Sequence, residues 1–294
     1  MSINISEYNL DDPTDDRCAP GKKFENGSCL TIESLINMAN AYNKDNPHNK
    51  IKLKEGYEVV HPDSYKKILL KQFQKKFSSC SSQKCWLEQN FMKFVDEQHK
   101  REIEEQTFLP EGPTGRFEWL NTLNINDVMV QYESHYPDFK FFGAVPINFD
   151  NLPTLGIKDA NYKELVKNGK TKFGYVFNLD EHWQSGSHWV AMYADVKKGE
   201  LIYFDSYGTL PEKRIRELMI RLKEFSKKHF NLNKLYIDHN KQRHQYKNSE
   251  CGVYSINFIL RMLKGEPFSK IESDRLPDNE VNQCRKAYFK NAVF

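Results

Sequence analysis

The first 110 residues carry apolar side chains at the spacing of amphipathic helices. Three stretches show this period, and they are residues 31–43, 62–77 and 85–106. Thr31 begins the first stretch and is a suitable N-cap, because its hydroxyl can accept a hydrogen bond from the first turn. Residues 1–30 lack a clear period and are rich in Asp, Gly and Asn. We therefore predict a helical N-terminal arm domain over residues 1–110, with an irregular beginning.

The hydrophobic pattern changes after residues 109–115. This segment has the sequence LPEGPTG, and its two Pro and two Gly residues predict a break between domains. Beyond it, short runs rich in β-branched and aromatic residues predict strands at 173–178, 188–195, 200–205 and 234–239. Two longer runs predict helices at 211–230 and 251–265, and the second is apolar nearly all round, which indicates burial. We therefore predict an α+β second domain over residues 111–294.

Composition and charge narrow the classes of function. The chain has 294 residues, of which 39% are hydrophobic and 13% aromatic, so a substantial core can form. No run of about 18 apolar residues occurs, and we expect no membrane partner. The formal net charge of +3 is small and gives no reason to expect nucleic acid. A basic stripe on the 211–230 helix is expected to be a solvated face, and its residues are Lys213, Arg214, Arg216, Arg221 and Lys223.

Six cysteines bear on the redox compartment and on metal binding. The first sixteen residues are acidic and polar, unlike a signal or transit peptide. We therefore expect the protein to stay in a reducing compartment, with its cysteines as free thiols. Four cysteines in the arm lack the C-x2-C spacing typical of zinc sites, so we predict no metal and no cofactor; they are Cys18, Cys29, Cys80 and Cys85.

Three residues suited to nucleophilic catalysis stand at the ends of predicted elements. His188 begins a strand in SGSHWVAM, Asp205 ends the next strand in LIYFDSYG, and Cys251 begins the buried helix in HQYKNSECGVYS. A histidine can take the proton of a thiol, and a carboxylate behind it fixes the tautomer and stabilises the imidazolium. The partial positive charge at a helix N-terminus also favours a thiolate. The combination predicts a cysteine nucleophile activated by a His–Asp pair.

Each of these residues also has an ordinary structural explanation when it is taken alone. A histidine beside a tryptophan at a strand end is commonly structural, and an aspartate before SYG commonly forms a turn. A cysteine in an apolar helix commonly packs in the core. Only the combination of the three indicates a reactive site.

The motifs around these residues resemble those of the Ulp1-like SUMO proteases and the adenovirus protease. GSHWVAM, YFDSYG and HQYKNSECGVYS are similar to the His-Trp, Asp-Ser and Gln…Cys-Gly blocks of that clan, in the same order. Gln245 lies six residues before Cys251, which is the spacing of the clan's oxyanion-hole glutamine. EWLNTLNIND at 118–127 resembles the block that opens the Ulp1 catalytic domain. The resemblance covers roughly residues 115–265 and is strongest to the polyprotein proteases of large cytoplasmic DNA viruses, such as African swine fever virus and giant viruses.

The resemblance implies a fold and a catalytic set. The fold would be an Ulp1/adenovirus-protease-like cysteine protease core, with a mixed sheet flanked by helices, over residues 111–294. The catalytic residues would be His188, Asp205, Gln245 and Cys251. The swine fever virus enzyme carries Asn at the third triad position, whereas this chain has Asp, the usual residue of the wider clan.

The resemblance also implies substrate-binding residues. Trp189 and Trp119 would cover a narrow tunnel that admits only glycines, and core packing is the alternative for each. Asn178 would touch the substrate backbone, and a turn at the strand end is its alternative.

The function implied is that of a viral cysteine endopeptidase. It would cleave structural polyproteins or core proteins after Gly-Gly during virion maturation, in the host cytoplasm and the virion. Two alternatives stay open, namely a protease that deconjugates SUMO-like or ubiquitin-like proteins, and a non-catalytic binding module on the same fold. An oxidised virion would also allow disulfides among the four arm cysteines, as an alternative to buried thiols.

Overall fold

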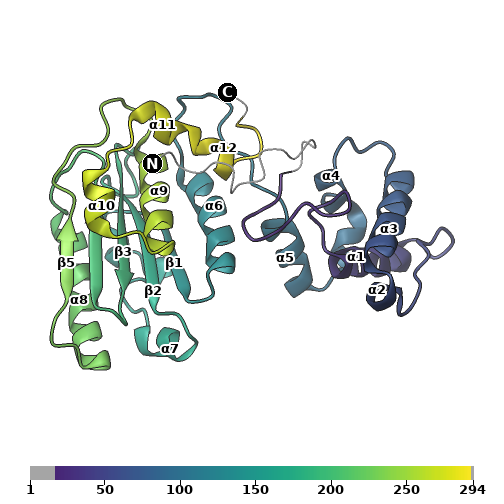
Figure 1. Cartoon of the computed structure of the whole chain (residues 1–294), viewed down its shortest axis with the longest axis horizontal. Helices are drawn as coiled ribbons and strands as arrows, with labels where there is room; N and C mark the ends of the chain where they lie inside the picture. Colours follow the sequence, from purple (N-terminus) through teal and green to yellow (C-terminus); the bar gives the residue numbers. More distant parts are fainter. Residues whose placement is uncertain (1–16, 293–294) are drawn as a thin grey trace. The chain divides into compact units, whose positions relative to one another are not determined.

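The computed structural model describes residues 17–292, and the chain divides into two compact units (Figure 1). The first unit is Met1–Glu111 and the second is Gly112–Phe294. The division falls inside the Pro- and Gly-rich segment 109–115. The part of the predicted irregular arm that spans residues 1–16 lies outside the described residues.

The first unit consists of short helices around a hydrophobic core of its own. The helices are α1 Ile32–Asp45, α2 Tyr57–Val60, α3 Pro62–Lys76, α4 Lys84–Leu87, the 3-10 helix η2 Asn90–Phe94 and α5 Glu97–Gln106. In the core, the rings of Phe73 and Trp86 stack with their centroids 5.4 Å apart. Thr31 caps α1 as predicted, since its hydroxyl accepts a hydrogen bond from the Ser34 amide.

The prediction of one continuous helix over residues 85–106 is wrong. The backbone is extended at Gln89 and again at Val95 and Asp96, which separates α4, η2 and α5. Asp96 begins the last helix anew, because its carboxylate accepts a hydrogen bond from the His99 amide. Such local capping competes with continuation of a helix through the same residue.

The four arm cysteines are not free thiols, and that prediction is wrong. They form two disulfides within the first unit, Cys18–Cys29 and Cys80–Cys85. The alternative of disulfides describes them correctly, and their sulfur atoms are then not available as thiolate ligands for zinc. Across residues 17–292, no group of three or more His, Cys, Asp or Glu side chains is arranged to hold a metal ion. Cys251 and Cys284 remain free and are buried.

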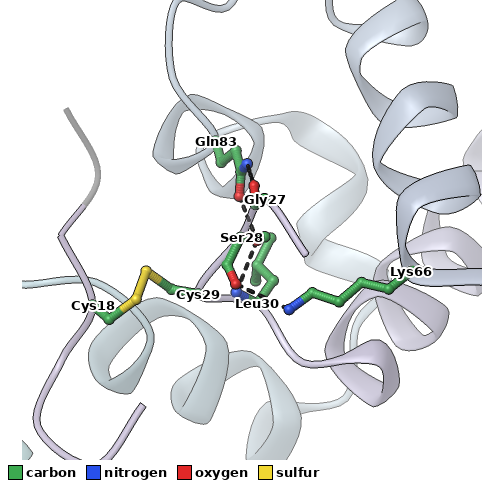
Figure 2. The surroundings of a disulfide bond; sticks show 7 residues. All are labelled: Cys18, Gly27, Ser28, Cys29, Leu30, Lys66 and Gln83. Carbon is green, nitrogen blue, oxygen red and sulfur yellow. Dashed lines mark hydrogen bonds between the residues drawn. A yellow bond between two sulfur atoms is a disulfide. The ribbon is translucent and has the colours of Figure 1, made fainter. Parts of the chain in front are cut away.

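Figure 2 shows how the segment around the Cys18–Cys29 disulfide is fixed. Lys66 of α3 donates from Nζ to the Ser28 carbonyl at 2.9 Å, and Gln83 donates to the Gly27 carbonyl at 2.7 Å. Over residues 17–31, the described segment before α1, there is no helix or long strand. The disulfide and these hydrogen bonds therefore take the place of regular secondary structure.

The second unit, over residues 112–292, has a mixed five-stranded sheet with the strand order β1-β2-β3-β4-β5. The strands are β1 Phe139–Pro146, β2 Lys172–Asn178, β3 Trp189–Asp195, β4 Glu200–Phe204 and β5 Tyr236–His239. The outer pairs are parallel and the two inner pairs antiparallel. Figure 1 shows β5 and β1 at opposite edges of the sheet. The helical elements of this unit are α6 Thr122–His135, η3 Phe149–Asn151, η4 Pro153–Leu155, α7 Tyr162–Lys167, α8 Lys213–Phe230, α9 Cys251–Leu263, α10 Phe268–Ser273, α11 Asp278–Gln283 and α12 Arg285–Tyr288.

Alternating strand residues give the sheet two buried faces. Val190 and Met192 of β3 belong to the core that also contains Leu218 of α8. On the other face, Phe204 stacks on Phe258 of α9 with centroids 5.0 Å apart. α9 is thus buried nearly all round, as predicted, and among the described helices none is long and apolar enough to cross a bilayer.

The helix over residues 211–230 is observed as α8, but its basic stripe is not simply solvated. Arg221 forms a bidentate ion pair with Asp150, with Nη–O distances of 2.6 and 2.9 Å. Arg214 pairs with Glu181 at 2.8 Å. Part of the stripe therefore ties α8 to the loops that follow β1 and β2.

Candidate active site

Antiparallel pairing of β3 with β4 brings the predicted histidine and aspartate to one end of the sheet. Ala191 pairs with Phe204 in this ladder. The start of β3, which follows His188, therefore lies beside the end of β4, which precedes Asp205. α9 packs against β3 and begins with Cys251, so the three residues converge from three elements.

His188 and Asp205 form a buried hydrogen-bonded pair. His188 Nε2 lies 2.6 Å from Asp205 Oδ1. The Cys251 side chain also interacts with His188 and raises its pKa, and the contact with Asp205 leaves Nδ1 as the nitrogen that can face the thiol. The imidazole therefore stands between a carboxylate and a thiol, which is the arrangement needed for proton transfer from the thiol.

The carboxylate of Asp205 is held by several donors. The Tyr207 amide donates to it at 2.9 Å, and Thr209 donates from both its amide and its hydroxyl. Asn240 accepts from the Asp205 amide and donates to its carbonyl. Burial alone would raise the pKa of Asp205, but the hydrogen bonds from His188, Thr209 and Tyr207 outweigh burial and lower this pKa. The aspartate therefore stays ionised in a buried position.

Cys251 is the first residue of α9 and is 3% exposed. The first backbone hydrogen bond of the helix runs from the Tyr254 amide to the Glu250 carbonyl, so the helix does not use the amide of Cys251. The next residue is Gly252, which has no side chain at a point where the backbone passes close to another segment of the chain. A Cβ at Gly252 would lie 3.0 Å from Cβ of Leu120.

The surroundings of His188 favour the imidazolium. Burial alone would lower the pKa of His188, but the interactions with Asp205 and Cys251 outweigh burial and raise the pKa to about 9. A raised pKa means that the proton is held up to about pH 9 and lost above it. A protonated His188 can donate to a leaving amine, and it stabilises a thiolate beside it.

We expect kcat/KM to fall as the pH rises through about 9, because His188 then loses the proton that it must give to the leaving amine. In the Asp205→Asn variant this alkaline limb should move down by about 1–3 pH units, since the negative charge that raises the pKa is removed. The measurement is the pH profile of kcat/KM for both proteins. An alkaline limb at the same pH in both proteins would contradict the assignment.

Gln245 is fully buried beside this pair. Its Oε1 accepts from the Ser206 hydroxyl at 2.6 Å, and its Nε2 donates to the Lys247 carbonyl at 2.7 Å. An amide nitrogen carries two hydrogens, so Nε2 has a second N–H for another acceptor. The side chain is therefore fixed in position and can still donate a hydrogen bond.

Tyr207 contacts the catalytic histidine but was not singled out from the sequence. Its ring stacks on His188, with centroids 4.3 Å apart and planes 5° apart. Arg243 lies over the Tyr207 ring, with Cζ 4.8 Å from the centroid. The stack restricts the plane of the imidazole. The position of Tyr207, two residues after Asp205, could have indicated this contact. The residues that follow a strand end commonly lie at the same site as the strand end itself.

Arg285 is a second residue that the sequence did not indicate. It is buried, and its Nη2 donates to the carbonyls of Glu118 at 2.6 Å and Ser249 at 3.2 Å. It therefore joins the segment before Trp119 to the segment before Cys251. No motif could have found it, since it lies outside the region that resembles the protease blocks.

A cavity of about 340 Å³ lies next to the start of β3. Its walls include all three residues predicted to bind substrate, Trp119, Trp189 and Asn178. Trp189 is buried, and its Nε1 donates to the Leu120 carbonyl at 2.8 Å, which fixes the indole plane. Trp119 is 45% exposed at the same cavity. Trp119 and Trp189 therefore line one concave surface, and Trp189 directly follows His188 in the chain.

Asn178 has a structural role in addition to its place on the cavity wall. Its Oδ1 accepts from the amides of Asp180 at 3.0 Å and Ser187 at 3.2 Å. The side chain thus holds the loop between β2 and β3, as the turn alternative predicted. Its Nδ2 lies 2.7 Å from the position that a Cβ would take at Gly186.

Comparison with known proteins identifies the family. The model of the family described as "Ulp1 protease family, C-terminal catalytic domain" matches residues 177–292. A thiol protease of Acanthamoeba polyphaga mimivirus is 40% identical over 282 residues, which are 93% of this chain and 93% of that protein. A SUMO-1 cysteine protease of African swine fever virus is 26% identical over 231 residues, which are 72% of this chain and 84% of that protein.

The fold is also that of a solved relative. The crystal structure of the African swine fever virus protease matches with a TM-score of 0.59 at 23% identity, over 77% of this chain and 89% of the other. This likeness confirms the predicted α+β core with a mixed sheet flanked by helices. The mimivirus relative matches at 40% identity over nearly the whole length. The chain therefore belongs to the Ulp1 protease family, and it is a viral cysteine protease.

Proposed function

We propose that this protease cleaves structural polyproteins or core proteins after Gly-Gly during virion maturation. The observation that carries the proposal is the cavity that Trp119 and Trp189 line, where Trp189 directly follows His188 in the chain. We expect a substrate that passes between the two indoles to have little room for a side chain. Glycine is then selected by exclusion, because it has no Cβ.

In the proposed mechanism Cys251 is the nucleophile. Its thiolate attacks the scissile carbonyl, and His188 takes the thiol proton and returns it to the leaving amine. Asp205 keeps the imidazole oriented and stabilises its charged form. The contacts of His188 with both partners support these roles.

The negative charge that develops on the carbonyl oxygen needs donors. We assign this role to the second N–H of Gln245 Nε2 and to the backbone N–H of Cys251. The Gln245 side chain is held by the Ser206 hydroxyl and the Lys247 carbonyl. The backbone N–H of Cys251 stands at the start of α9. Removing one such donor typically costs about 3 kcal/mol in the transition state.

Opening the tryptophan wall should relax the selection of glycine. Wild type should cleave Gly-Gly-X and reject Ala-Gly-X and Gly-Ala-X, whereas Trp189→Ala should reduce the penalty for alanine. The overall rate should fall, because the peptide is held less firmly for attack. The measurement is kcat/KM on the three peptides with both enzymes.

Trp183 provides a matched control. It is an exposed tryptophan in the loop between β2 and β3, and it is not part of the cavity wall. Trp183→Ala should keep the wild-type preference for glycine. An unchanged preference in Trp189→Ala would assign Trp189 to core packing and leave glycine selection to other residues.

A second function keeps the same chemistry with a different substrate. The African swine fever virus relative is named a SUMO-1 cysteine protease, which favours a deconjugating activity on ubiquitin-like proteins as the alternative. Cleavage of a folded ubiquitin-like fusion in preference to an extended Gly-Gly-X peptide would support this alternative. Efficient cleavage of the extended peptide alone would support the endopeptidase.

We place the proposed activity in the host cytoplasm and the virion. Disulfides persist where thiols can be oxidised, and a virion is such an environment. The two disulfides of the first unit are compatible with a virion, while the catalytic unit keeps Cys251 as a free thiol. Detection of the protease in purified particles by mass spectrometry would test this location.

A further inference from the structure

Basic and aromatic side chains alternate on the surface beside the catalytic cysteine. Phe117 is 50% exposed, with Arg116 Cζ 5.1 Å and Lys247 Nζ 5.4 Å from its ring centroid. Tyr246 is 62% exposed, with Arg243 Cζ 5.0 Å from its ring centroid. Arg275 Cζ lies 4.6 Å from the same ring. Cations over ring faces are held in place without an acidic partner.

These side chains form one continuous surface that reaches the catalytic site. Lys247 joins the ring of Phe117 to the loop that carries Tyr246. At its other end the surface meets His188, since Arg243 lies over Tyr207 and Tyr207 stacks on His188. We call this the basic–aromatic surface, and its residues are Arg116, Phe117, Arg243, Tyr246, Lys247 and Arg275.

Two cations of this surface, Arg243 and Lys247, have no carboxylate partner in the described part of the chain. Their polar contacts are the Gln245 carbonyl and the Asn279 amide oxygen. Arg275 forms a long ion pair with Asp278, with Nη2 3.9 Å from Oδ2.

The acidic groups near the surface are already engaged in local contacts. Asp278 is buried and accepts hydrogen bonds from the Tyr246 amide and the Tyr254 hydroxyl. Glu250 is buried, and its carboxylate accepts from Ser249. Glu118 accepts from the Gly115 amide. Carboxylates supplied by a ligand could therefore form ion pairs with the cations of this surface.

We propose that the basic–aromatic surface binds acidic side chains of the protein substrate close to the bond that is cut. The proposal rests on the proposed endopeptidase function and names a second determinant of specificity besides glycine. A polypeptide is favoured over nucleic acid because the surface ends at the catalytic histidine. A chain that presents its scissile bond to Cys251 lies next to the end of this surface, because Tyr207 stacks on His188 and Arg243 lies over Tyr207.

Binding to the inactive Cys251→Ala protein tests the proposal without turnover. Fluorescently labelled Gly-Gly-X peptides would carry three Glu, three Gln or three Lys residues, placed either before Gly-Gly or after X. On one of the two sides, the Glu peptide should bind roughly tenfold more tightly than the Gln peptide at low salt, and the difference should shrink as salt is raised. The Lys peptide should bind more weakly than the Gln peptide.

Variants locate the effect on the surface. Lys247→Gln and Arg243→Gln, each in the Cys251→Ala background, should reduce the ratio of Gln-peptide Kd to Glu-peptide Kd by roughly threefold. Lys228→Gln is the matched control, since Lys228 is an exposed lysine in the last turn of α8. It should leave the ratio unchanged. The ratio compares two peptides on one protein, so a general loss of binding does not imitate the effect.

Equal affinities for the Glu and Gln peptides on both sides of the scissile bond would overturn the proposal. So would an equal loss in the Lys228→Gln control. A single-stranded oligonucleotide that binds more tightly than the Glu peptide and displaces it would assign the surface to nucleic acid instead. Cleavage of the Gln peptide by the active enzyme tests the Gly-Gly endopeptidase separately, so failure of one proposal does not imply failure of the other.

Discussion

Substituting alanine for Cys251 is expected to abolish peptide cleavage while the protein keeps its fold. Loss of a triad nucleophile typically lowers kcat on the order of 10⁶-fold. A helix N-terminus tolerates alanine, and only one sulfur atom is removed from a buried site, so the free energy of unfolding should fall by only about 1 kcal/mol. The measurements are kcat/KM on a Gly-Gly-X peptide and the Tm of the variant.

Cys284 provides the matched control for this substitution. It is the second buried free cysteine of the described chain, and burial raises its pKa to about 12, so it stays a neutral thiol. Cys284→Ala should therefore cleave the peptide at close to the wild-type rate. Retained cleavage by Cys251→Ala would end the assignment of the nucleophile.

Replacing Gln245 by alanine is expected to lower kcat by about 10²–10³-fold with little change in KM. The proposed N–H of Gln245 contacts the oxygen mainly in the transition state, and such contacts appear in kcat rather than in KM. Ser206→Ala removes the hydroxyl that holds Gln245 Oε1 but keeps the donor, so its effect should be smaller. Steady-state kinetics of both variants check the prediction. A raised KM with unchanged kcat would make Gln245 a substrate-binding residue instead.

The catalytic residues could be predicted because each stands at an element boundary that the hydrophobic pattern reveals. His188 precedes β3, Asp205 follows β4 and Cys251 begins α9. Antiparallel neighbours bring such boundaries to one end of a sheet. The distances between the side chains could not be predicted, since they depend on side-chain hydrogen bonds such as those of Thr209 and Asn240.

Other parts of the fold lack a signal of this kind. Strand β1 was not predicted, and its register shifts between Phe141 and Ala144, where Gly143 has a φ of 105°. This irregularity interrupts the alternation on which a strand prediction depends. The pairing of cysteines is set by how the chain packs, and Arg285 acts through backbone carbonyls that leave no trace in a residue pattern. Both features needed the three-dimensional structure.

Timed alkylation with iodoacetamide, followed by peptide mapping, tests the central claim most directly. A thiolate reacts far faster than a neutral thiol, so the reaction reports whether the His188–Asp205 pair activates Cys251. We expect Cys251 to be modified well before Cys284, and the His188→Ala variant to slow modification of Cys251 alone. Modification of Cys251 no faster than of Cys284, or at the same rate in His188→Ala, would contradict the account.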